Sequence, residues 1–244
     1  MTESVSTRAK SDARYRLGAV LTGRTKPLGP HGEPSGIFKT VRAGPVSIEK
    51  TGILGDEQGD AKHHGGEQKA VHHYALDHYA AWRTELADRT DCFAMPGAFG
   101  ENFSTVDMTE ASVCVGDVYR VGTALLQVSQ ARQPCWKLNA RFDTPDMASR
   151  VQDSARTGWY YRVLQPGTAQ AGDELALLER SNPGWPLDKL LHYMYIETLN
   201  REALFQIAQM CFLAESWRRL ATRRLDRRIV EDWSQRLTRP FERE

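Results

Sequence analysis

The sequence predicts an α+β protein in which a β-rich, barrel-like domain with peripheral helices is followed by a small all-α appendage. Short β-type runs alternate with Gly- and Asp-containing turns from residue 17 to about residue 180. After the chain breaker Ser181–Gly184, apolar residues recur instead at three- and four-residue spacing. We therefore expect a tail over residues 1–16, a β-rich domain over 17–180 and a helical domain over 185–240.

The elements follow in chain order. Residues 1–16 are polar and charged and lack the apolar run of a signal peptide, which predicts a frayed tail. Strands are expected at the apolar runs Leu17–Leu21, Val113–Val115, Val118–Val121, Leu125–Val128, Trp159–Leu164 and Leu175–Leu178. Turn residues between the last two of these runs predict a hairpin. One helix is expected over Tyr74–Asp88, where apolar side chains recur near helical spacing.

Three or four short helices are expected in the appendage, where apolar residues recur at helical spacing over Leu187–Leu199, Glu202–Phe212 and Glu215–Leu225. Residues 180–244 hold 12 Lys plus Arg and 9 Asp plus Glu, which gives this part a net charge of +3. Six arginines fall within eleven residues, at Arg218, Arg219, Arg223, Arg224, Arg227 and Arg228. They form either a solvated helix face paired with nearby acidic residues or a docking surface for an acidic protein or an anionic ligand.

Composition narrows the class of protein. The chain has 244 residues, of which 41% are hydrophobic and 26% charged, and its net charge is +1. These values are typical of a globular protein and exclude a fully disordered chain or a strongly basic binder of nucleic acid polymers. No apolar run reaches the length of a membrane-spanning helix, so we expect a cytoplasmic protein without a membrane partner. The four cysteines form no CxxC pair, which excludes a zinc knuckle and a dithiol redox motif.

Five of the seven histidines lie within sixteen residues, at His63, His64, His72, His73 and His78. Their spacing matches neither HExxH nor HxHxDH, so a zinc hydrolase is the last of the functional alternatives. Gly65 and Gly66 follow His64 and precede Lys69. Two glycines let a backbone approach a bound anion and offer it N–H donors, although a simple tight turn explains the pair equally well.

The segment Ser129–Asn139 is the most informative. Cys135 lies on a loop directly after an expected strand, between Arg132 and Lys137. Neighbouring positive charge favours the thiolate form of a cysteine, which serves as a nucleophile or as a ligand to a soft metal. A small buried hydrophobe is the alternative. Gly100-Glu101-Asn102 offers acceptors and donors suited to a purine-like or pterin-like edge, or forms a turn in which Asn102 caps its own backbone.

Taken in order, these segments resemble the MOSC domain, which is the C-terminal domain of molybdenum cofactor sulfurases. The segments that carry the resemblance are Pro34–Ile37 with Lys39, Gly55–Gln58, His64–Gly66 with Lys69, Phe99–Ser104, Gly116-Asp117 and Arg132–Asn139. Within the family the chain is similar to the bacterial stand-alone proteins that confer resistance to 6-N-hydroxylaminopurine (YiiM-like). Glu215–Trp217 and Arg223–Leu225 resemble the three-helix appendage of that subgroup.

The resemblance implies a β-rich, barrel-like fold and the molybdenum cofactor (Mo-molybdopterin), a pterin dithiolene with a terminal phosphate. It implies an oxidoreductase that reduces N-hydroxylated compounds to amines and thereby detoxifies base analogues. Electrons would come from a separate flavoprotein or iron–sulfur protein. By this resemblance Cys135 is the catalytic molybdenum ligand, and the cofactor-binding residues are Lys39, His64, Gly65, Gly66, Lys69, Gly100, Glu101, Asn102, Arg132, Lys137 and Asn139. His64 and His73 are the candidate proton donors.

Two other functions use the same residues. A carrier or sensor would bind the cofactor without turnover, but it does not need an inner-sphere thiolate such as Cys135. A sulfur-transfer protein would carry a persulfide on Cys135, but the chain has no pyridoxal-phosphate domain to generate the sulfur. We therefore expect a reductase that acts on a small N-hydroxylated substrate, and leave open whether the chain forms a homodimer.

Overall fold

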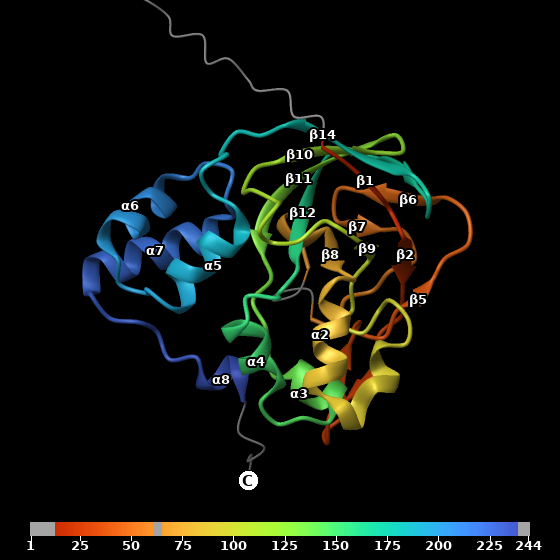
Figure 1. Cartoon of the computed structure of the whole chain (residues 1–244), viewed down its shortest axis with the longest axis horizontal. Helices are drawn as coiled ribbons and strands as arrows, with labels where there is room; N and C mark the ends of the chain where they lie inside the picture. The colour runs from red at the N-terminus through yellow and green to blue at the C-terminus, as the bar shows by residue number, and fades with distance from the viewer. Residues whose placement is uncertain (1–12, 61–64, 239–244) are drawn as a thin grey trace, which may run out of the picture.

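A nine-stranded sheet forms the centre of the molecule (Figure 1). The computed structural model describes residues 13–60 and 65–238, and all statements below concern these residues. From one edge to the other the strands are β1 (Arg14–Arg16), β14 (Glu174–Glu179), β10 (Val118–Val121), β11 (Ala124–Ala131), β12 (Trp159–Gln165), β8 (Val71–Ala75), β9 (Phe103–Thr105), β2 (Ala19–Thr22) and β5 (Thr40–Val41). β8 and β9 pair in parallel, whereas the other neighbours pair antiparallel. The α+β class is therefore confirmed.

The sheet is open. In the part of the chain that the structure describes, β1 pairs with β14 alone and β5 pairs with β2 alone, so no ladder joins the two edges. The barrel-like closure expected from the sequence is therefore not confirmed. Two small sheets accompany the large one. They are β13 (Gly167–Ala169) with β6 (Val46–Glu49) and β7 (Gly52–Ile53), and the hairpin of β3 (Lys26–Leu28) and β4 (Glu33–Ser35).

Helices lie around one end of the sheet and in the appendage (Figure 1). The first group is α2 (His78–Glu85), η2 (Ala87–Phe93), α3 (Lys137–Phe142) and α4 (Met147–Asp153), whereas the short helix η1 (Glu67–Lys69) contacts β11 and β12. The second group is α5 (Leu187–Tyr195), α6 (Arg201–Gln209) and α7 (Glu215–Arg227). The last helix, α8 (Ser234–Leu237), follows α7 in the chain but lies beside α4 (Figure 1). α6 begins where the Asn200 side chain accepts a hydrogen bond from the Ala203 N–H at 3.1 Å, and α7 ends at Arg228 in the left-handed conformation. No helix in the described residues is long and apolar enough to cross a membrane.

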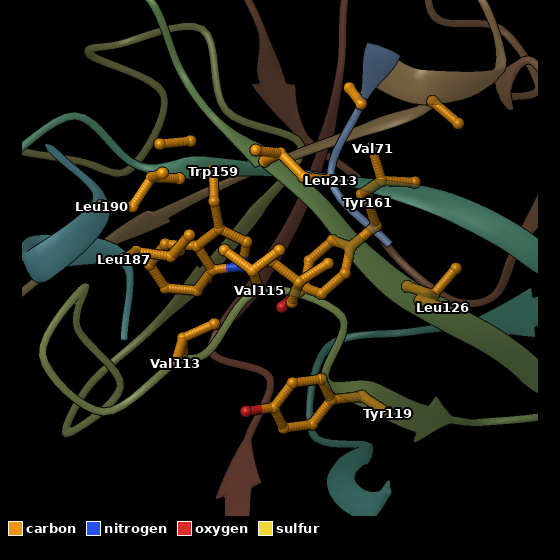
Figure 2. Packing of buried hydrophobic residues seen from close by; sticks show 14 of the residues in the cluster. Val71, Val113, Val115, Tyr119, Leu126, Trp159, Tyr161, Leu187, Leu190 and Leu213 are labelled. Carbon is orange, nitrogen blue, oxygen red and sulfur yellow. The ribbon is translucent and has the colours of Figure 1, made fainter. Parts of the chain in front are cut away.

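One hydrophobic core joins the sheet to the appendage. Trp159 and Tyr161 of β12 lie in the same buried cluster as Leu187 and Leu190 of α5, as Figure 2 shows. Trp217 of α7 belongs to this cluster as well. A second buried cluster lies among α2, η2, α3 and α4, where the rings of Tyr74, Trp82, Phe99 and Phe142 meet. The appendage therefore packs against the sheet rather than standing apart from it.

Several expected elements differ from those observed. Tyr74, expected in a helix over Tyr74–Asp88, lies in β8, and α2 begins only at His78. Strand β8 is buried on both faces between β12 and β9, so its apolar residues do not alternate with polar ones. The hairpin expected from Trp159–Leu164 and Leu175–Leu178 was wrong, because β10 and β11 lie between β12 and β14.

Two smaller differences concern short segments. Residues Arg14–Arg16, expected in the tail, form β1 through pairing with β14, while residues 1–12 lie outside the described residues. Val113–Val115 forms no named strand, and Cys114 makes an isolated bridge to Pro186. The strands expected at residues 118–121, 125–128, 159–164 and 175–178 and the helices that became α5, α6 and α7 were correct in type and place.

Candidate functional site

A cleft lies where the loop after β11 meets β8, β12 and the loops around residues 35–39, 56–59 and 99–102. Its lining residues are Ser35, Gly36, Ile37, Lys39, Asp56, Glu57, Gln58, Gly59, Lys69, His72, Phe99, Gly100, Asn102, Arg132, Cys135, Lys137 and Tyr160. Seven of the residues expected from the sequence therefore come together here. They are Lys39, Lys69, Gly100, Asn102, Arg132, Cys135 and Lys137.

Cys135 is half-buried on the loop between β11 and α3. β11 ends at Ala131, and the Arg132 N–H donates to the Gly158 carbonyl at 3.0 Å. Beyond the cysteine, α3 starts at Lys137, and the Leu138 N–H donates to the Cys135 carbonyl at 2.9 Å. The thiol thus lies on a short connection held at both ends by secondary structure.

The cationic side chains on the cleft have different surroundings. Lys39 and Asp56 form a buried ion pair, with side chains 5% and 1% exposed, and Asn102 Nδ2 donates to Asp56 Oδ2 at 2.8 Å. Burial lowers the pKa of Lys39, an effect that Asp56 opposes. Burial also lowers the pKa of Lys69, opposed by the nearby Cys135. Lys137 is half-buried, and its ammonium donates to the Pro34 carbonyl at 2.8 Å.

Two buried nitrogen atoms on the cleft have no hydrogen-bond partner among the described residues: Nη1 of Arg132 and Nε2 of His72. Burial and then the positive charge of Arg132 hold the pKa of His72 well below 6.5, so the imidazole is neutral at pH 7. The His72 ring lies 4.9 Å from that of Tyr160, and Lys69 Nζ lies 5.9 Å from the same Tyr160 ring. Buried polar atoms without partners are uncommon and point to a ligand that completes them.

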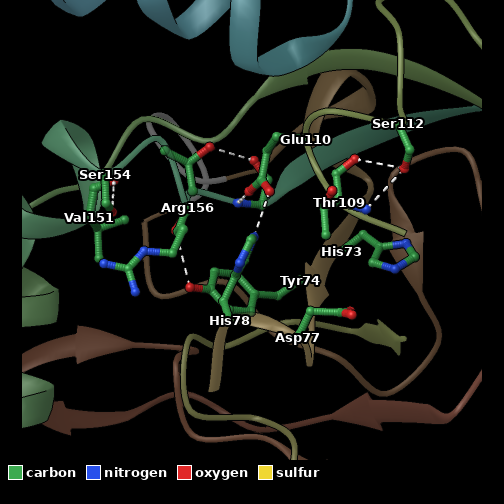
Figure 3. A network of polar contacts seen from close by, with 12 residues as sticks. His73, Tyr74, Asp77, His78, Thr109, Glu110, Ser112, Val151, Ser154 and Arg156 are labelled. Carbon is green, nitrogen blue, oxygen red and sulfur yellow. Dashed lines mark hydrogen bonds and ion pairs between the residues drawn. The ribbon is translucent and has the colours of Figure 1, made fainter. Parts of the chain in front are cut away.

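A network of polar contacts around Glu110 holds Gly158, whose carbonyl binds the Arg132 backbone (Figure 3 shows the network). Glu110 Oε1 accepts the Gly158 N–H at 2.7 Å, and Glu110 Oε2 lies 2.6 Å from His78 Nε2. Gly158 in turn accepts the Arg132 N–H, and a Cβ at residue 158 would lie 3.0 Å from His72 Nε2 and 2.4 Å from the His73 carbonyl. Gly158, at φ +71°, is therefore a position where a side chain would displace the site.

Other expected residues are placed away from the cleft. The buried Glu101 carboxylate accepts hydrogen bonds from Tyr79 Oη at 2.6 Å and from the Gly97 and Phe99 N–H groups at 2.6 and 3.0 Å. Its role in this structure is to hold the loop before Gly100. Asn139 bridges the Leu237 carbonyl and the Ala148 N–H.

The remaining expected residues belong to the histidine-rich segment. Gly65 and Gly66 lead into η1, which carries Lys69, and Gly66 has a φ of +90° that suits glycine. His64 lies outside the described residues. His73 is fully buried in the sheet core rather than on the cleft, with Nε2 2.8 Å from Thr105 Oγ1 and Nδ1 3.0 Å from Tyr161 Oη. His72, His73 and His78 thus have separate partners, and no three metal-ligating side chains gather within the described ranges.

Ten lining residues were not assigned to the site from the sequence, and three of them have contacts that matter here: Asp56, His72 and Tyr160. Asp56 stands in the Gly55–Gln58 segment, which carries the resemblance but was given no role. His72 was counted among the histidines and was distinguishable from His73 only by the strand alternation that places adjacent residues on opposite faces. The pattern offers no signal for Tyr160, because its position depends on the pairing of β12 with β8.

Comparison with known proteins identifies the family. A family model for the MOSC domain matches residues 60–176, and one for the YiiM-like, 3-alpha helix domain matches residues 185–228. Protein YiiM of Escherichia coli (strain K12) is 36% identical over 218 residues, which span 89% of this chain and 96% of that protein. The chain belongs to the MOSC domain family.

One further relative and two crystal structures are also similar to this MOSC protein over most of its length. A protein named Reductase from Gibberella moniliformis is 39% identical over 193 residues, or 78% of this chain and 34% of that longer protein. The crystal structure of YiiM from Escherichia coli superposes with a TM-score of 0.79 at 32% identity and covers 92% of this chain and 98% of that one. YiiM from Geobacillus stearothermophilus gives a TM-score of 0.73 at 34% identity, covering 86% of this chain and 99% of that one. The fold is therefore YiiM-like over nearly all of the chain.

Proposed function

We propose that this MOSC protein binds molybdenum cofactor in the cleft and reduces N-hydroxylated compounds, such as N-hydroxylated purine bases and hydroxylamines, to the amines. The observation that supports the proposal most is the thiol of Cys135 beside two buried groups, Arg132 and His72, that each have an atom without a partner among the described residues. Leaving such atoms unpaired costs about 1–3 kcal/mol each, so a ligand that pairs with them gains affinity.

The donor set of the cleft fits the cofactor. Molybdenum cofactor is anionic through its phosphate, and its metal accepts soft sulfur ligands. Asp56 compensates the charge of Lys39 within the protein, whereas Lys69, Arg132 and Lys137 supply positive charge along the cleft. The thiolate of Cys135 would ligate the metal, and the three cations would hold the anionic groups.

When bound, the cofactor supplies the two-electron cleavage of the N–O bond, which no side chain can perform. The chain itself binds and orients the cofactor and the substrate and forms hydrogen bonds with them. Arg132 presents a buried guanidinium: the Gly158 carbonyl accepts its backbone N–H, and its side chain is hydrogen-bonded to that of Tyr160. The neutral imidazole of His72 offers Nε2 to a ligand atom, since burial keeps its proton affinity low.

The similarity to a protein named Reductase supports a redox role over simple carriage of the cofactor. In the proposed cycle a separate flavoprotein or iron–sulfur protein delivers the electrons. The carrier role remains the second candidate, because it uses the same cleft and the same cofactor. Turnover distinguishes the two.

The decisive experiment compares wild type with Cys135→Ser after expression in a host that makes molybdenum cofactor. We expect wild type to carry molybdenum and to reduce a hydroxylamine when given a chemical reductant. Cys135→Ser should lose at least about 10²-fold of that activity while staying folded, because a hydroxyl does not replace a thiolate as a ligand to a soft metal. Metal analysis, circular dichroism and steady-state rates are the measurements.

Cys211→Ser is the matched control, because Cys211 is exposed on the appendage and should retain full activity. Full activity of Cys135→Ser would contradict the ligand assignment. Molybdenum bound by wild type at one equivalent without any turnover would support the carrier instead. A protein that takes up no molybdenum in such a host would contradict both.

A further inference from the structure

The C-terminal helix α8 contacts the loop of Cys135 on both sides of the cysteine. Nη1 of Arg236 donates to the Pro134 carbonyl at 2.6 Å, and the Trp136 N–H donates to the Arg236 carbonyl at 2.7 Å. Pro134 and Trp136 are the two residues adjacent to Cys135. One arginine thus holds the backbone directly before and directly after the thiol.

Arg236 is itself fixed by its surroundings. Its Nη2 donates to Gln152 Oε1 of α4 at 2.6 Å, and its guanidinium lies 5.7 Å from the centre of the Tyr195 ring of α5. Gln152 and Tyr195 are both buried. In addition, the carbonyl of Leu237, the next residue, accepts Asn139 Nδ2 of α3 at 2.8 Å. A planar guanidinium with several donors suits this position, because it serves two acceptors and an aromatic ring at once.

A chain of contacts joins α8 to the helices of the appendage. Arg224 of α7, with a fully buried side chain, donates to both carboxylate oxygens of Glu231 at 3.0 and 2.6 Å and to the Met194 carbonyl at 2.8 Å. Glu231 Oε1 also accepts Trp233 Nε1 at 2.8 Å, and the Trp233 ring lies 5.6 Å from that of Tyr195. Residues 224–237 therefore form a tethered path from α7 to the Cys135 loop, and Figure 1 shows this segment descending from α7 to α8 beside α4.

We propose that Arg236 is a positioning residue that fixes the Cys135 loop and thereby makes the C-terminal segment part of the candidate site. The catalytic meaning of this role rests on the proposed function of Cys135. The positioning itself is a property of the cofactor-free protein and is testable without turnover. Without Arg236 the Pro134 carbonyl and the Gln152 amide lose a charged donor, so the loop opens more often.

The experiment measures the alkylation rate of each cysteine with iodoacetamide, followed by mass spectrometry, in the cofactor-free full-length chain. In Arg236→Ala we expect Cys135 to react at least about fivefold faster than in wild type, because local opening governs access to a half-buried thiol. Cys211, exposed on the appendage, should react at an unchanged rate and is the internal reference. In Arg236→Lys the increase should be smaller, because an ammonium reaches one of the two acceptors but not both.

Arg227→Ala provides the matched control, because Arg227 is exposed on α7 and its removal leaves the loop contacts in place. Circular dichroism and thermal denaturation establish that each variant is folded at the temperature of the assay. A rate for Cys135 within twofold of wild type in folded Arg236→Ala would overturn the proposal. If Arg236→Ala does not fold, an unchanged Cys135 rate in folded Arg236→Lys overturns it in the same way. Failure of the proposed function would leave these rates unaffected, because no cofactor takes part.

Discussion

His73 is a residue at which burial has a measurable consequence. Its imidazole is fully buried, stacks on Trp159 at 4.4 Å between ring centres and contacts Thr105 and Tyr161. Burial lowers the pKa of His73 from 6.5 to about 3. The unfolded chain therefore takes up a proton below pH 6.5 that the folded chain does not take up until about pH 3. The contribution of the neutral His73 to the free energy of unfolding is therefore full above pH 6.5 and is lost as the pH decreases towards 3.

We expect His73 alone to make the free energy of unfolding fall by up to about 1.4 kcal/mol per pH unit below pH 6.5. His73→Gln removes the titrating group and should flatten this dependence, although it lowers stability at neutral pH through the lost ring stacking. His72, whose pKa is lowered as well, retains its own contribution of the same sign in the variant. Urea denaturation at a series of pH values is the measurement, and equal slopes in the two proteins would refute the prediction.

The identity of the cleft residues was largely predictable from the sequence, but the direction in which each side chain points was not. The thiol of Cys135, all four predicted cations, Gly100 and Asn102 line the cleft. The side-chain orientations of the other predicted residues were not predictable. Glu101 is turned towards Tyr79 and the loop backbone, and Asn139 towards Leu237. Which of two carboxylates or two adjacent histidines faces a cleft depends on strand pairing and loop packing, and residue type carries no information on either.

Within α7, the burial of the individual arginines distinguishes between the two interpretations of the arginine run, a solvated helix face and a docking surface. Arg223 is exposed, whereas the side chain of Arg224 is fully buried and bonded to Glu231 and Met194. We expect Arg224→Ala to lower the free energy of unfolding by about 3 kcal/mol, because it leaves a partly buried carboxylate and a carbonyl without a donor.

Arg223→Ala is the neighbouring control and should change stability by no more than about 0.5 kcal/mol. Denaturant unfolding of both variants gives the comparison. Equal effects of the two substitutions would show that Arg224 contributes no more than a surface charge. Arg224 therefore cannot serve as part of a docking surface, which leaves exposed members of the run, such as Arg223, Arg227 and Arg228, for that role.

Helices and strands were predictable where the local residue pattern determines them. They were not predictable where pairing between distant strands determines them. α5, α6 and α7 present apolar stripes at helical spacing, and β10, β11, β12 and β14 carry β-type runs bounded by turns. β8 lacks such a signal, because its five residues are all buried on both faces of the sheet and include two histidines. Its parallel pairing with β9 and its place between β9 and β12 come from long-range contacts that no local window contains.

The whole molecule combines a sheet and an appendage in one core. Leu187, Leu190 and Trp217 of the appendage share a buried cluster with Trp159 of β12, and Arg162 of β12 donates to the Phe212 carbonyl at 2.8 Å. Removing the appendage from the sheet would expose apolar surface on both, at a cost of about 25 cal/mol per Å². The boundary at residues 180–185 therefore separates two sequence families and two types of secondary structure. We do not expect the two parts to unfold independently.

We therefore expect the full-length chain to lose the appendage and the sheet in one cooperative transition. Far-ultraviolet circular dichroism follows the helices, and pulsed alkylation of Cys114, 3% exposed and bridged to Pro186 before α5, follows the junction. The two probes should give the same urea midpoint, because unfolding of α5–α7 removes the partners of the sheet core. A helical transition that is complete before Cys114 becomes reactive would contradict this expectation and would show that the appendage unfolds on its own. Arg224→Ala should shift both midpoints together, since the residue it removes ties α7 to the segment that reaches the Cys135 loop.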